Sequence, residues 1–124
     1  MYSINEVAAL CGVTAHTLRF YDKEGLLPFV GRNAAGKRIF SDGDLLLVKV
    51  ICCLKNTAMP IKDIKRYIEL IMEGDATKDT RRSMMIEHRK EVLRQMDELK
   101  KNLNIIDLKV ALYETNNMDL LREI

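Results

Sequence analysis

Apolar residues recur at helical spacing along most of this chain, and polar residues mark where each run starts and stops. The pattern predicts helices at about residues 4–10, 15–24, 42–56, 60–72 and 77–113. Residues 32–40 form a basic, Gly-containing stretch between apolar segments, which is the composition of a short β-hairpin. The predicted fold class is therefore mostly α, with one small hairpin and a long C-terminal helix.

The first two predicted helices carry clear end signals. Ser3 and Glu6 have the spacing of a capping box at the start of the first helix. Thr14 is a good N-cap for the second helix, and Gly25 supplies its C-terminal stop. Two short helices joined by a tight turn, with Arg19 on the second, are typical of a helix-turn-helix that enters the major groove of DNA. A capped helix pair could equally be plain packing, so this motif alone leaves both interpretations open.

The hairpin and the second helix share an excess of positive charge. Between residues 14 and 40 the charged residues are Arg19, Lys23, Arg32, Lys37 and Arg38 against Asp22 and Glu24. A local basic face of this kind attracts phosphate more directly than the formal net charge of +2 of the whole chain. The hairpin therefore has the composition of a wing that reaches across a DNA backbone. A solvated basic surface is the alternative.

The last predicted helix carries a continuous apolar seam. Its members recur at a step of seven and then at steps of four and three: Met85, Val92, Met96, Leu99, Leu103, Ile106, Val110 and Tyr113. Because charged residues flank this seam, it has the a/d pattern of a coiled coil. A narrow seam on one helix needs a partner helix, most simply the same helix of a second copy. The seam predicts a homodimer interface at Val92, Met96, Leu99, Leu103, Ile106, Val110 and Tyr113.

Composition argues against several classes of protein. The chain has 124 residues, 48% hydrophobic and 31% charged, which is ordinary for one soluble domain. Its longest apolar runs are too short to span a bilayer, and its start has no signal-peptide pattern. Three cysteines, two of them adjacent, do not make a disulfide framework, so we expect a reducing cytoplasm. The sequence has no catalytic motif, so we expect no enzyme, no metal and no other cofactor.

Four motifs stand in a characteristic order: residues 14–27, 36–40, 44–45 and 59–64. Together they closely resemble the MerR family of transcription regulators, and the resemblance extends from Tyr2 to about Tyr113. It implies a winged helix-turn-helix domain followed by a helix that pairs antiparallel, as a coiled coil, across a homodimer. It also implies a pseudo-palindromic promoter site that the dimer bends and undertwists, so that RNA polymerase is activated indirectly.

The helix-turn-helix geometry and the resemblance together assign contacts on DNA. Early residues of the second helix point into the groove, so Ala15 and His16 are the first candidates for base contacts. The resemblance adds a phosphate contact from the Tyr21 hydroxyl; where the family often has a further Tyr, this chain has Phe20. The start of the helix at 60–72, with Lys62, offers amide groups to another phosphate, although Lys62 could equally be a solvated lysine. The predicted DNA contacts are Thr14, Ala15, His16, Thr17, Arg19, Phe20, Tyr21, Arg32, Lys37, Arg38 and Lys62.

The candidate sensor is a cysteine. No cysteine lies beyond Cys53, so the thiolate metal site that many family members have at the dimer helix is not expected. Cys52 and Cys53 point about 100° apart on a helix, so one should pack inward and the other should lie near the surface. Residues 53–56 and 73–77 resemble the aldehyde- and electrophile-responsive branch of the family. That resemblance implies a stress response in which Cys53 reacts with a small electrophile; two inert thiols are the alternative.

The expected organisation is a DNA-binding domain at residues 1–72, a break at 73–76, a dimerisation helix at 77–113 and a tail at 114–124. The predicted function is a sequence-specific, homodimeric DNA-binding regulator that activates a promoter. Three alternatives remain: a MerR-type regulator with a non-thiol effector, an architectural DNA-binding protein without an inducer, and a pure coiled-coil interaction protein.

Overall fold

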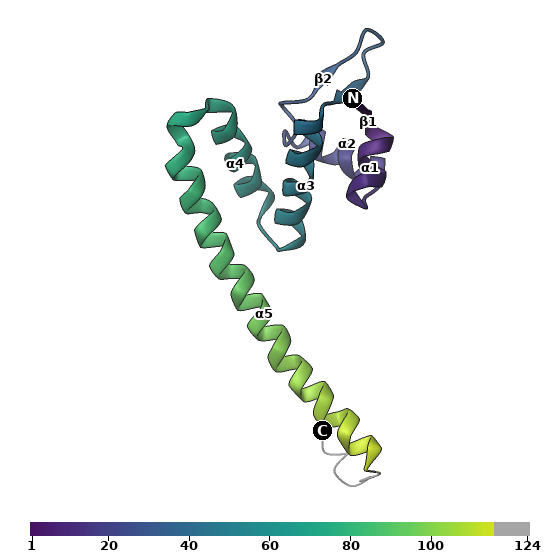
Figure 1. Cartoon of the computed structure of the whole chain (residues 1–124), viewed down its shortest axis with the longest axis vertical. Helices are drawn as coiled ribbons and strands as arrows, with labels where there is room; N and C mark the ends of the chain where they lie inside the picture. The colour runs from purple at the N-terminus through teal and green to yellow at the C-terminus, as the bar shows by residue number, and fades with distance from the viewer. Residues whose placement is uncertain (116–124) are drawn as a thin grey trace. The chain divides into compact units, whose positions relative to one another are not determined.

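The structure, a computed structural model, describes residues 1–115 (Figure 1). Its elements in chain order are β1 (Tyr2–Ser3), α1 (Ile4–Cys11), α2 (Ala15–Lys23), β2 (Gly31–Arg32), β3 (Arg38–Phe40), α3 (Asp42–Asn56), α4 (Ile61–Glu73), the short 3-10 helix η1 (Asp75–Thr77) and α5 (Lys78–Glu114). This confirms the predicted fold class, mostly helical with a small sheet and a long C-terminal helix. The predicted tail at 114–124 lies, from residue 116 on, outside the described residues.

The predicted caps define the first two helices. Ser3 Oγ accepts a hydrogen bond from the Glu6 amide at 3.2 Å, and Glu6 Oε1 accepts one from the Ser3 amide at 3.0 Å, which completes the capping box of α1. Thr14 Oγ1 accepts from the Thr17 amide at 3.1 Å and so caps α2. Between them Gly12 has φ +68°, a left-handed conformation that lets the chain turn sharply from α1 into α2.

The sheet contains one strand more than the hairpin expected from the sequence. Its strand order is β1-β3-β2, and both pairings are antiparallel, with Tyr2 opposite Phe40 and Gly31 opposite Ile39. β1 has only two residues, too few for an alternating pattern to mark it. By pairing with β3, it attaches the base of the wing to the start of α1.

The core of the first unit comes from α1, α2, the loop after α2, β3, α3 and α4. The largest fully buried side chains are Val7, Leu18, Leu26, Leu27, Phe40, Val48, Ile51, Ile64 and Ile68. Burying each such side chain stabilises the fold by about 1.5–3 kcal/mol relative to leaving it in water. These buried side chains therefore pack α1, α2, α3, α4 and β3 together around one core.

The connection from α4 into α5 is held by a buried hydroxyl. Thr77 Oγ1 lies within hydrogen-bonding distance of the Leu70 carbonyl, at 2.5 Å, and of the Gly74 carbonyl, at 2.8 Å. Arg81 Nε donates to the same oxygen at 3.1 Å. Because Thr77 is buried, this network satisfies polar groups that water cannot reach.

The chain divides into two compact units, Met1–Met84 and a second that begins at Met85. The second unit consists, in its described part, of the remainder of α5, which has no buried residue. No helix among residues 1–115 is long and apolar enough to cross a membrane.

Candidate nucleic-acid interface

Helix α2, the second helix of the predicted helix-turn-helix, has two distinct faces. Leu18 and Tyr21 are buried and hold the helix in the core. His16, Arg19 and Phe20 are exposed, and their spacing of three and four residues places them on one face. Of the other predicted contacts, Ala15 and Thr17 are half-buried, and Thr14 is exposed with its hydroxyl 3.0 Å from that of Thr17.

Tyr21 differs from the rest of the predicted set because it belongs to the core. Its side chain is only 5% exposed, and burial raises the pKa of its phenol. The neighbouring ring of Phe20 is tilted by 54° against it, with the centroids 6.2 Å apart. Phe20 is thus the aromatic ring that α2 presents at its surface.

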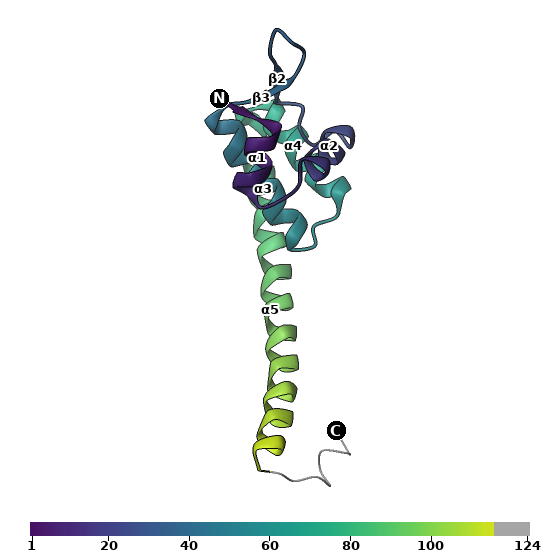
Figure 2. The same cartoon turned by 90° about the vertical axis from the view of Figure 1, so that its right-hand side faces the viewer.

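The wing is a hairpin that stands out from the rest of the first unit (Figure 2). Asn33 shapes its tip, because Asn33 Oδ1 accepts hydrogen bonds from the amides of Ala35 and Lys37, each at 3.0 Å. Arg32 Nη1 donates to the Gly36 carbonyl at 2.7 Å, and Gly36 has φ +77°. Arg32 therefore folds back along the hairpin, and the exposed side chain of Lys37 follows the turn.

Arg38, also a predicted DNA contact, has internal partners. Its guanidinium donates to Asp22 through Nε at 3.0 Å and through Nη2 at 2.7 Å. Its Nη1 donates to the Val30 carbonyl. The sequence did not predict that Asp22 pairs with Arg38, because no local pattern links residues 16 positions apart.

The wing, α1 and α2 border a concave surface whose hollow has a volume of about 470 Å³. It is lined by Ser3, Ile4, Asn5, Arg19, Asp22, Arg32, Gly36, Lys37 and Arg38. The structure thus brings together Arg19, Arg32, Lys37 and Arg38 of the predicted set, with Asp22 as the acidic member of the lining. A concave, cationic surface of this kind concentrates field lines and favours a polyanion such as a DNA backbone.

Lys62 lies elsewhere, in the first turn of α4, where it is exposed. Pro60 precedes this helix and provides no side-chain cap. Further along α4, Lys65 lies over the end of α2, since a Cβ added at Gly25 would meet Lys65 Cε at 3.1 Å. The left-handed φ of +82° favours glycine at position 25, because side chains of other residues rarely adopt it.

Comparison with known proteins shows which family shares this sequence and fold. Residues 2–71 match the family of MerR HTH family regulatory proteins. An HTH-type transcriptional regulator of Haemophilus influenzae is 46% identical over 113 residues, which cover 91% of this chain and 84% of that protein. The chain belongs to the MerR family. Its relatives are transcriptional regulators, so it is a DNA-binding regulator of transcription and not an enzyme.

Solved MerR structures match nearly the whole chain. The structure of HiNmlR, a MerR family regulator lacking the sensor domain, bound to promoter DNA, has a TM-score of 0.85 and 44% identity, covering 94% of this chain and 93% of its own. A MerR family regulator from Bacillus thuringiensis has the same TM-score with 43% identity, covering 89% and 96%.

The three thiols of this MerR-family chain have different surroundings. Cys52 is buried, Cys11 is half-buried, and the two thiols hydrogen-bond to each other. Burial and, to a smaller extent, the contact with Cys11 together raise the pKa of Cys52 to about 11. Cys53 is exposed. Burial raises the pKa of the Cys11 thiol, and the charge of Lys49 opposes this rise.

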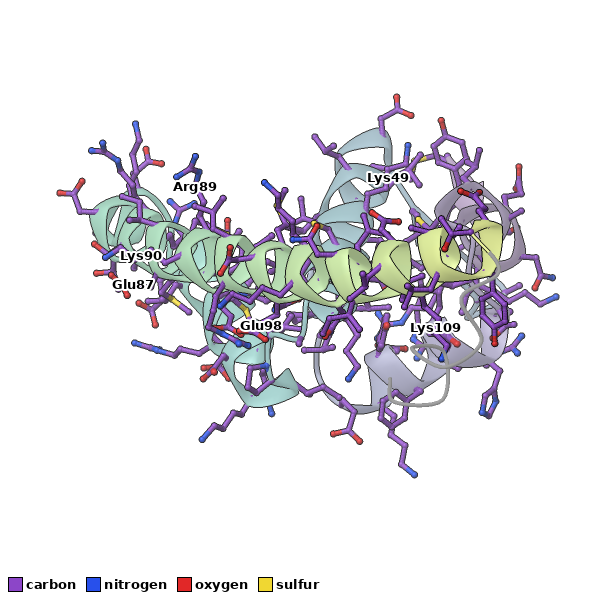
Figure 3. All side chains as sticks on the ribbon, turned by 90° about the horizontal axis from the view of Figure 1, so that it is seen from below. Lys49, Glu87, Arg89, Lys90, Glu98 and Lys109 are labelled. Atoms are coloured by element: carbon purple, nitrogen blue, oxygen red, sulfur yellow. The ribbon has the colours of Figure 1, made fainter. Side chains whose placement is uncertain are left out.

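The predicted dimer residues form an apolar surface on α5. Leu99 is 69% exposed and Met96 60%, and Leu103, Ile106, Val110 and Tyr113 are also exposed, whereas Val92 is half-buried. Charged side chains such as Glu87, Lys90 and Glu98 project from the same helix (Figure 3). Ion pairs along α5 join Lys90 to Glu87, Arg94 to Glu91 and Lys101 to Asp97. Among residues 1–115, no cluster of three or more His, Cys, Asp or Glu side chains could hold a metal ion.

Proposed function

We propose that two copies of this chain bind one pseudo-palindromic promoter site and activate transcription by distorting it. The observation that carries this proposal is the likeness of the chain to HiNmlR bound to promoter DNA, together with the cationic concave surface between α2 and the wing. In each copy the exposed face of α2, with His16 and Arg19, enters the major groove. Arg32 and Lys37 of the wing lie against the adjoining phosphates.

The apolar seam of α5 supports the homodimer. An exposed stripe of Met, Leu, Ile, Val and Tyr side chains is unfavourable in water, and the described residues of one chain leave it uncovered. A second α5 in antiparallel orientation would cover the stripe along its whole length. Two-fold symmetry then places one DNA-binding unit on each half of a palindrome.

DNA distortion is the means of activation. A dimer that holds two half-sites can bend and undertwist the base pairs between them, and the deformation energy is offset by the added contacts of helix and wing. Polymerase then meets its two recognition elements in register without needing a direct contact from the dimer.

Cys53 is the proposed sensor for an aldehyde or related electrophile. It is the exposed thiol, whereas Cys52 is buried and keeps its proton. A thiol adds to an aldehyde carbonyl to give a hemithioacetal: sulfur bonds to the carbonyl carbon, and the thiol proton ends on the carbonyl oxygen. The adduct enlarges a side chain near the end of α3, and this change would shift the balance between inactive and activating conformations.

Run-off transcription from the chain's own upstream region tests these statements. Wild type, Cys53→Ala and the control Cys11→Ala are each assayed with and without a small aldehyde. We expect the aldehyde to activate wild type and Cys11→Ala but not Cys53→Ala, with equal DNA binding by all three. Equal activation of Cys53→Ala would eliminate the sensor role and leave a non-thiol effector. DNA binding with no effect on transcription under any condition would favour the architectural role.

A further inference from the structure

Arg38 and Asp22 form an ion pair in the lining of the concave surface between α2 and the wing. Both carboxylate oxygens of Asp22 accept from Arg38, at 3.0 Å and 2.7 Å, and a third nitrogen of the same guanidinium donates to the Val30 carbonyl. A bidentate pair between a guanidinium and a carboxylate fixes direction as well as distance, because the two planar groups must lie edge to edge.

The Arg38 side chain connects three separate parts of the fold. Asp22 lies in the last turn of α2, Val30 lies just before β2, and Arg38 is the first residue of β3. The side chains of Asp22 and Arg38 are each 23% exposed, so the pair is partly withdrawn from water and less screened than a surface ion pair. The base of the wing is therefore tied directly to the recognition helix.

We infer that Asp22 and Arg38 are positioning residues for DNA binding, whose ion pair sets the place of the wing relative to α2. The DNA part of this inference rests on the proposed function. Arg19 of α2 and Lys37 of the wing line the same concave surface as the pair. Because the pair fixes the base of the wing, it fixes the separation of these two cations, which must match two positions on one DNA duplex.

For neutralisation of Asp22, the inference predicts a change in DNA affinity opposite to the one expected from charge alone. Asp22 is a carboxylate on a surface that faces phosphates, so its neutralisation should strengthen binding if charge alone mattered. It would also release Arg38, a cation, toward the DNA. If the pair positions the wing, neutralising Asp22 weakens binding in spite of the gain in positive charge.

The experiment measures the affinity of the full chain for a promoter fragment as a function of salt. Asp22→Asn and Arg38→Gln are each expected to weaken specific binding by about tenfold, and the double variant also by about tenfold, because each single change already breaks the same pair. The control Glu24→Gln removes a nearby exposed carboxylate that lies outside the concave surface, and it should not weaken binding. Lys37→Ala should lower the slope of log affinity against log salt by about 0.9, as expected for one lost phosphate contact.

Tighter binding by Asp22→Asn, or losses that multiply in the double variant, would overturn the inference and restore Arg38 as a direct phosphate contact. In that case Arg38→Gln alone would lower the salt slope by about 0.9, as expected for one lost phosphate contact.

A measurement on the DNA-free protein keeps this test separate from the proposed function. Amide hydrogen exchange of residues 31–40 should be about tenfold faster in both Asp22→Asn and Arg38→Gln than in wild type, and unchanged in Glu24→Gln. Unchanged exchange in Asp22→Asn would refute the positioning role whether or not the promoter fragment is bound. Failure of wild type to bind the fragment, with faster exchange in both variants, would reject the proposed function and retain the tie between wing and helix.

Discussion

Adjacent cysteines of α3 have opposite surroundings, and this difference decides their chemistry. Cys52 is buried and its pKa is raised to about 11, whereas Cys53 is exposed. Only a thiolate reacts readily with an alkylating reagent, so burial and the raised pKa both protect Cys52.

Iodoacetamide at pH 8 should therefore alkylate Cys53 first. Mass spectrometry of wild type is expected to show a fast first modification, which Cys53→Ala lacks and Cys11→Ala retains. The residual labelling of Cys52 should rise as pH approaches about 11, because its folded-state thiolate forms only there. Fast labelling of Cys52 in Cys53→Ala at pH 8 would contradict this assignment.

Arg19 is the cation that α2 itself contributes to the concave surface. Removing it in Arg19→Ala should weaken DNA binding by about tenfold and lower the salt slope by about 0.9 if it contacts one phosphate. Titration of a labelled promoter fragment at several salt concentrations measures both quantities. The matched control is Lys100→Ala, an exposed cation on α5, which should change neither. An unchanged slope in Arg19→Ala, with a loss confined to the cognate sequence, would instead assign Arg19 to a base.

Single elements were predictable from sequence where the signal is local. The range Asp42–Asn56 was predicted for α3 and is observed, and the ends of α4 and α5 differ from prediction by one residue. The capping box of α1 and the apolar seam of α5 depend on residues three to seven positions apart, so the sequence reveals them directly. β1 and the pair between Asp22 and Arg38 depend on residues distant in the chain, and no periodic pattern records such contacts.

Helix α5 offers an internal control for its proposed dimer interface. Leu99 lies in the middle of the seam and is 69% exposed, whereas Ile105 is 63% exposed but lies about 120° away around the helix. Leu99→Glu should yield monomers by sedimentation, because an antiparallel pair brings the two introduced carboxylates together near its two-fold axis. Ile105→Glu should remain dimeric. Dimers in Leu99→Glu, or monomers in Ile105→Glu, would place the interface on a different face.

The joint between α4 and α5 depends on the hydroxyl of Thr77. Thr77→Val keeps the shape of the side chain but leaves the Leu70 carbonyl without its hydrogen bond in a buried place. This should lower the free energy of unfolding by about 1–3 kcal/mol, the usual cost of an unsatisfied buried polar group. Chemical denaturation measures the change. Thr80→Val, at an exposed position of α5, should have almost no effect. Equal stability of the two variants would mean that water replaces the lost donor.

The proposed function assigns two activities to different parts of the chain. The first unit, Met1–Met84, holds the surface suited to DNA, and the second, beginning at Met85, holds most of the apolar seam proposed for dimerisation. Neither activity alone would select a promoter: a monomer reads one half-site, and a helix pair without the first unit reads none. Under the proposed function, specific binding to a promoter would therefore require both units.

This coupling makes binding sensitive to the rotational phase of the two half-sites. Inserting about five base pairs between them turns one half-site by about half a helical turn and presents its major groove on the opposite side of the duplex. Affinity should then fall to that of a fragment carrying a single half-site. Inserting about ten base pairs restores the phase but separates the half-sites by about 34 Å more, so a dimer held by one continuous helix pair should recover little affinity. Leu99→Glu is the control, since a monomer should bind all three fragments alike. Unchanged wild-type affinity across the insertions would mean that the two copies read DNA independently, and distortion by a rigid dimer would no longer explain activation.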